Sequence, residues 1–105
     1  MSKEFKGTPG NWQSKFRPDL EVQGDLHIVY AGGDSPEKAY HVAYSAGWTD
    51  NETSKKEAEA NARLICAAPD LLKALQFALP WLPTADGEAI HIAEQAINKA
   101  LGITS

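Results

Sequence analysis

The chain has a single cysteine, Cys66, among its 105 residues. A disulfide framework within the chain is therefore excluded, and a reducing compartment, the cytosol, is expected. The sequence also lacks an apolar run that approaches the roughly 20 residues needed to cross a bilayer. Residues 1–6 are polar and do not resemble a secretion signal. No membrane partner is expected.

The sequence also lacks the residue spacings on which metal and catalytic sites are usually built. Its three histidines, His27, His41 and His91, are scattered, and the chain has no HxH or CxxC pair. We therefore expect no metal and no cofactor. Cys66 lies in an Ala-rich stretch and is expected to be a small buried filler instead of a nucleophile. Because no nucleophile, base and orienting group can be assembled from the spacing, the protein is not expected to be an enzyme.

Basic charge is scarce outside the N-terminal segment. Residues 1–17 hold four basic residues and one acidic residue, a net of +3, so the remainder sums to −7 within a total of −4. An acidic body opposes binding to a phosphate backbone, and a nucleic-acid partner is not expected. Apolar residues make up 43% of the chain and charged residues 23%. This composition predicts one folded domain over residues 1–105, with residues 1–7 as a disordered arm.

Turn and strand signals fill the first half. Thr8-Pro9-Gly10-Asn11 predicts a tight turn, and residues 12–16 predict a short strand. Leu26–Tyr30 and Tyr40–Tyr44 read as strands separated by the turn formers of residues 32–36, which predicts an antiparallel hairpin. With Tyr30 opposite Tyr40, one face of the hairpin is apolar and is expected to pack on helices: Leu26, Ile28, Tyr30, Tyr40, Val42 and Tyr44. The other face, with His27, Val29, His41 and Ala43, is expected to be wetter.

Helix signals fill the second half. Ser54-Lys55-Lys56-Glu57 matches a capping box and predicts the first helix. Pro69 is expected to end that helix and to open a second one, which carries Leu71, Leu72, Leu75 and Leu79. A third helix is predicted from Asp86 to Gly102. The expected fold is therefore α+β. A small antiparallel sheet, made of the hairpin Leu26–Tyr44 and a short N-terminal strand, is followed by three α-helices packed on one face.

Two segments resemble those of a large set of small phage and prophage proteins. Residues 8–12 resemble a T-P-G-x-W opening, and residues 61–75 resemble an N-A-R-L-I-x-A-A-P-x-L-L-x-A-L segment. The ending at residues 96–102 is also similar, so the resemblance covers most of the chain. The sequence departs from the set at Asn11, where Pro is common, and at Cys66, where a small residue is usual. The resemblance implies a phage setting, a location in the cytoplasm of a bacterial host and a role against host machinery. It supplies no catalytic residues.

Six residues are candidates for binding. Trp48 lies in a polar loop and is either an interface anchor or stacking platform, or a lid over the sheet. Arg63 and Asn61 either recognise an anionic ligand or stabilise the fold. In the second case Arg63 bonds Glu59 or a loop carbonyl, and Asn61 caps a neighbouring strand. A nucleotide-like ligand would stack on Trp48 or a tyrosine and would place its phosphate near basic side chains. The candidates for binding are Trp48, Arg63, Asn61, Tyr44, Lys55 and Lys56.

Two functions follow from these observations. The first is a non-enzymatic phage accessory protein that binds a host protein, for example as an inhibitor of a bacterial defence system. The second is a protein that sequesters a small nucleotide-like signal. A small core also favours a homodimer, since association buries more apolar surface per chain.

Overall fold

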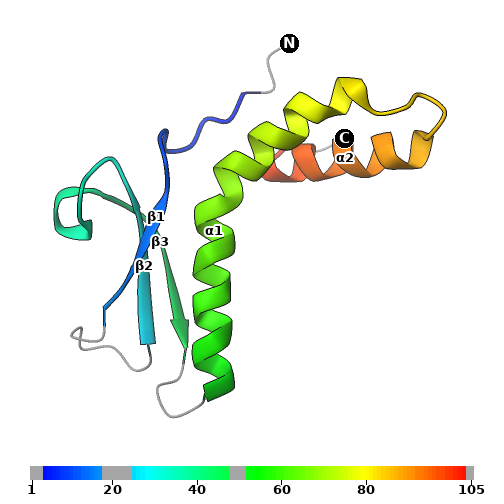
Figure 1. Cartoon of the computed structure of the whole chain (residues 1–105). Coiled ribbons are helices and arrows are strands. Elements are labelled where there is room, and N and C mark those ends of the chain that lie inside the picture. The colour runs from blue at the N-terminus through cyan, green and yellow to red at the C-terminus, as the bar shows by residue number, and fades with distance from the viewer. Residues whose placement is uncertain (1–3, 18–24, 48–51, 104–105) are drawn as a thin grey trace. The chain divides into compact units, whose positions relative to one another are not determined.

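The structure is a computed structural model that describes residues 4–17, 25–47 and 52–103. Two short 3₁₀ segments, η1 and η2, accompany the strands and α-helices. In chain order the elements are β1 (Gln13–Phe16), β2 (Asp25–Ala31), η1 (Pro36–Lys38), β3 (Tyr40–Gly47), α1 (Glu52–Ala78), η2 (Leu79–Trp81) and α2 (Gly87–Leu101) (Figure 1). They form two compact units. The sheet unit is Thr8–Ala68, and the helical unit holds the described residues before Thr8 and after Ala68. The expectation of a single domain stays a prediction.

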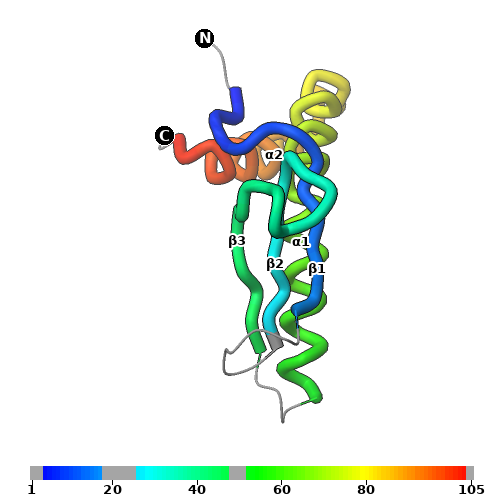
Figure 2. Tube along the Cα trace, turned by 90° about the vertical axis from the view of Figure 1, so that its left-hand side faces the viewer, coloured from blue at the N-terminus to red at the C-terminus, as the bar shows by residue number. Residues whose placement is uncertain are grey.

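The sheet has three antiparallel strands in the order β1-β2-β3 (Figure 2). The chain enters β1 through the predicted turn, in which Gly10 has a φ of +91°. Only glycine adopts that conformation without steric cost. The indole N–H of Trp12 donates a 3.0 Å hydrogen bond to the carbonyl of Thr8 and closes the turn. This bond gives the T-P-G-x-W segment a physical role in fixing the start of β1.

The hairpin of β2 and β3 was predicted correctly, but its register was not. Ile28 lies opposite Tyr44, and Tyr30 lies opposite His41 instead of Tyr40. A β-bulge between Val29 and Tyr30 separates the two pairings and leaves Val42 as the extra residue of β3. Sequence alternation cannot locate a bulge, because inserting one residue leaves both halves of the strand alternating as before.

The first part of α1 packs on the sheet face that carries His27 and Val29. The backbone of Gly47 approaches α1 so closely that an added Cβ would lie 2.5 Å from the carbonyl oxygen of Ser54. In α1, Ala58 and Ala62 are one turn apart and only 2% and 1% exposed. The expectation that the Leu26, Ile28 and Tyr44 face meets the helices is therefore wrong. The helix selects the face with small side chains, where the two backbones can approach.

The opposite face of the sheet is covered by the chain between β2 and β3. Figure 1 and Figure 2 place this connection on the side of the sheet away from α1. Pro36 of η1 is buried, and Ala39 packs against a buried cluster on β2 formed by Leu26, Ile28 and Tyr30. Residues 32–36, predicted to form a plain hairpin loop, therefore also shield an apolar surface.

The described residues contain two α-helices, not the predicted three, because α1 continues through Pro69 for 27 residues. Proline lacks the N–H that would bond the carbonyl four residues earlier, so it usually ends a helix. Here it is buried, and the helix extends on both sides of it. The predicted cap is also wrong. The helix begins at Glu52, so Ser54 lies inside the first turn.

In the helical unit, α2 agrees with its sequence signals. The Oδ1 atom of Asp86 accepts a 3.0 Å hydrogen bond from the N–H of Ala89 and caps the first turn. Gly102 ends the helix in the left-handed conformation, with a φ of +72°. Ala93 and Ile97 are the buried residues of α2. No helix in the described part of the chain is both long and apolar enough to cross a membrane.

Candidate functional site

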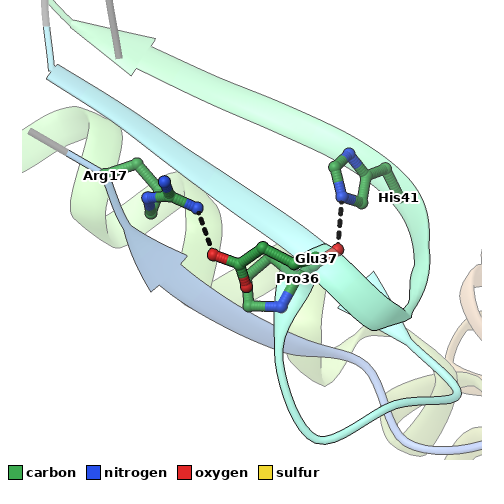
Figure 3. A network of polar contacts seen from close by, with 4 residues as sticks. All are labelled: Arg17, Pro36, Glu37 and His41. Carbon is green, nitrogen blue, oxygen red and sulfur yellow. Dashed lines mark hydrogen bonds and ion pairs between the residues drawn. The ribbon is translucent and has the colours of Figure 1, made fainter. Parts of the chain in front are cut away.

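A polar network ties the connection between β2 and β3 to the strands (Figure 3). Arg17 follows β1, where its N–H donates a 2.8 Å hydrogen bond to the carbonyl of Leu26. Its guanidinium then reaches the carboxylate of Glu37 in η1 at 2.8 Å. The pKa of Glu37 is lowered, first by a hydrogen bond from its own backbone N–H. The Ser35 hydroxyl and the positive charge of Arg17 lower this pKa further, against an opposing effect of desolvation.

His41 belongs to the same network. Its Nε2 atom lies 2.7 Å from the carbonyl oxygen of Pro36, and its Nδ1 atom lies 2.7 Å from the hydroxyl of Tyr44. The Nε2 contact holds the connection against β3, whereas the Nδ1 contact lies within β3, where Tyr44 orients the imidazole. His27 lies on the other face of the sheet, and the expectation that the two histidines share a face is wrong. Among the described residues no group of His, Cys, Asp and Glu side chains is placed to hold a metal.

A cavity of about 250 Å³ opens on the α1 side of the sheet unit. Strands β1 and β2 supply Phe16 and His27, whose rings lie 5.1 Å apart between centroids at an interplanar angle of 36°. Among the described residues, the first two turns of α1 supply the remaining wall, and their lining side chains are all charged: Glu52, Lys55, Lys56 and Glu59. The cavity therefore offers an aromatic surface beside a cluster of opposite charges.

The predicted binding residues do not converge on one place. Lys55 and Lys56 line the cavity, whereas Tyr44 lies on the opposite sheet face beside His41 and is 57% exposed. Asn61 is exposed on α1. Arg63 pairs with Glu59 at 3.3 Å, one turn away on the same helix, as the fold-stabilising interpretation expects. Trp48 lies outside the described residues. Cys66 is a free cysteine and is half-buried.

The sequence interpretation missed two prominent features. Phe16 and His27 were not recognised as neighbours, because their contact depends on the pairing of β1 with β2. In the helical unit, Phe77 and Trp81 lie four residues apart at the end of α1 and in η2, and they are 75% and 77% exposed. Phe77 lies within the predicted second helix and Trp81 follows Pro80, and neither position gives a separate sequence signal of exposure.

The comparisons with known proteins give one match. A family model described as Salmonella phage P22 protein Y8K6 matches residues 1–104. No curated protein and no solved structure matches the chain.

Proposed function

The chain belongs to the family of Salmonella phage P22 protein Y8K6, and from this premise we propose that it is a non-enzymatic accessory protein that binds a host protein. One observation carries the proposal. Phe77 and Trp81, one helical turn apart, each leave about three quarters of their side chains in water. Folding gains nothing from such exposure, since burying a large aromatic side chain is strongly favourable. Trp is also among the residues that most often dominate binding energy at protein interfaces.

The charge around this aromatic pair favours a protein partner over a nucleic acid. The helical unit, residues 1–7 and 69–105, has five acidic and four basic residues in its sequence, a net of −1. Aromatic residues that stack on bases normally lie within positively charged grooves that follow the phosphate backbone. An aromatic pair on a unit with no excess of basic residues instead fits an apolar patch on a protein.

The phage family supports a choice among host proteins as the partner. A non-enzymatic phage protein can act on its host by occupying a surface, and proteins of the host's antiphage defence are one class of target. We propose such a protein as the partner. Its inhibition would appear as improved phage plating on a host that carries the defence system.

The experiment is quantitative capture from a lysate of the bacterial host, followed by titration calorimetry with the purified partner. The test variant is Phe77→Ala/Trp81→Ala. Tyr40→Ala is the matched control, because Tyr40 is 75% exposed but belongs to the sheet unit. We expect the double variant to weaken binding at least about 30-fold, the effect of losing one hot spot, and the control to bind like wild type. The proposal fails if no captured protein distinguishes the double variant from the control while circular dichroism shows both to be folded.

A further inference from the structure

The cavity beside α1 contains a buried polar side chain that the fold itself does not use. His27 is only 9% exposed and lies in the wall of the cavity. Its ring contacts Phe16, but no hydrogen bond joins its imidazole to another described residue. The ring nitrogens of His27 are not among the fully buried unpartnered polar atoms in the described part of the chain, so they can be reached from the cavity. An accessible imidazole can donate to or accept from a ligand that enters the cavity.

We propose that this cavity binds a nucleoside monophosphate. The aromatic wall provides the surface for the base. Phe16 is 44% exposed, so part of its ring is open to a flat partner, and His27 lies beside it at a tilt of 36°. Stacking on an aromatic ring suits any nucleobase, because every base has a π-face. The imidazole of His27 can then donate to or accept from the edge of the base.

The charged wall provides for the phosphate and the sugar. Lys55 and Lys56 come from the start of α1, where the helix dipole also favours an anion. Glu59 opposes an anion less than its charge suggests, because Arg63 lies 3.3 Å from its carboxylate. The carboxylates of Glu52 and Glu59 are acceptors, and ribose hydroxyls are donors that carboxylates commonly bind.

The size of the cavity and the charge of the chain favour a single nucleotide over a polymer. A volume of about 250 Å³ lies near the lower end of ligand sites and matches a ligand with one base and one phosphate. Residues after position 17 sum to −7, which opposes the long phosphate backbone of a nucleic acid. This site is separate from the proposed host-protein surface, because the lining residues that the structure describes belong to the sheet unit.

The test is titration of the ¹⁵N-labelled full chain with adenosine and guanosine 5′-monophosphates, followed by NMR. We expect chemical-shift changes at Phe16, His27 and the first two turns of α1. Adenosine, guanosine and inorganic phosphate serve as partial ligands, and each is expected to bind at least 10-fold more weakly than the corresponding nucleotide. Inorganic phosphate that reproduces the same shifts at the same concentration would overturn the proposal, since it would reveal a simple anion site.

Two double lysine variants distinguish nucleotide binding in the cavity from a general effect of positive charge. Lys55→Ala/Lys56→Ala removes the cationic side chains of the cavity and is expected to weaken nucleotide binding at least 10-fold. Lys15→Ala/Lys38→Ala removes the same charge from exposed positions that do not line the cavity. That control is expected to bind within twofold of wild type. Equal loss in both double variants, or no loss in either, contradicts the site, as does the absence of any shift at millimolar nucleotide.

Phe16→Ala tests the aromatic wall in the same titration. Phe16 is partly exposed, so this variant is expected to fold, which the dispersion of its NMR spectrum checks directly. We expect nucleotide binding to weaken at least 5-fold, while the weak binding of inorganic phosphate is unchanged. A Phe16→Ala protein that binds the nucleotides as wild type does would remove the base-stacking part of the proposal and overturn it.

Discussion

The Oγ atom of Ser45 on β3 donates a buried 2.8 Å hydrogen bond to the backbone carbonyl of Ala58 in α1. The bond joins the sheet to the helix at a place where both elements carry small side chains. Ser45 is 6% exposed and Ala58 is 2% exposed. The close approach of Gly47 to Ser54 lies nearer the start of α1. We call this contact between β3 and the first part of α1 the seam. The sheet unit is therefore held by close backbone approach, with small residues in place of large apolar ones.

Replacing Ser45 with Ala is expected to lower the free energy of unfolding by about 0.5–1.5 kcal/mol, the net contribution of a typical hydrogen bond. Urea denaturation followed by circular dichroism measures this difference. Ser14→Ala is the control, because Ser14 is exposed on β1. Equal stability of the Ser45 and Ser14 variants would show that the bond does not hold the helix on the sheet.

Enlarging a residue in the seam is expected to be more harmful than losing its hydrogen bond. Ala62 is 1% exposed, so Ala62→Leu adds side-chain volume where none is free and should destabilise by about 1–3 kcal/mol. Ala60 is exposed on the same helix, and Ala60→Leu is expected to change stability by less than about 0.5 kcal/mol. Thermal unfolding compares the two variants. The tight seam is disproved if Ala62→Leu is as stable as Ala60→Leu.

Replacing the glycines at the two ends of α2 with alanine should change the stability of the protein in opposite directions. Gly102 has a φ of +72°, so Gly102→Ala is expected to destabilise by about 1–2 kcal/mol. A Cβ at Gly87 would meet nothing within 4 Å, and this residue is the first of the helix. Gly87→Ala is therefore expected to stabilise by up to about 1 kcal/mol through a stiffer unfolded chain. Melting temperatures that shift in the same direction would contradict the assigned conformations.

The Glu37 carboxylate should make the free energy of unfolding depend on pH under acidic conditions. Its folded pKa lies below the ordinary value of 4.5, so its contribution is complete above that value and is lost as the pH falls through the lowered pKa. The difference in unfolding free energy between wild type and Glu37→Gln is therefore expected to shrink between pH 5 and about pH 2. A difference that stays constant over this range would show that the carboxylate charge is not involved.

The Arg17→Gln variant measures how much of the lowering of the Glu37 pKa is due to the charge of Arg17. The carboxylate still accepts hydrogen bonds from its own backbone N–H and from Ser35 in this variant. NMR titration of the Glu37 side chain is therefore expected to show a pKa that rises only part of the way to 4.5. A full return to 4.5 would mean that Arg17, and not the backbone hydrogen bond, is the main cause.

Local signals in the sequence were enough for the elements whose cause lies within a few residues. The turn at Gly10, the strands of the hairpin, the cap at Asp86 and the end of α2 at Gly102 all appear where the sequence predicts them. Each depends on backbone conformations or hydrogen bonds between near neighbours. The phage family also follows from the sequence, since the family model matches residues 1–104. A candidate site was visible only in part, through Lys55 and Lys56.

Tertiary structure decided what depends on contacts between distant residues. Helix α1 packs on the sheet face that carries Ser45 and Val29, and not on the more apolar face of the hairpin, because small side chains let the helix approach. Pro69 continues a helix that its lack of an N–H predicts it should end. The cavity exists because strand pairing brings Phe16 to His27 and places both beside the start of α1. The sequence thus determined the strands, the last helix and the family. Packing determined the face of the sheet that meets α1, the number of helices and the site, since these depend on residues far apart in the chain.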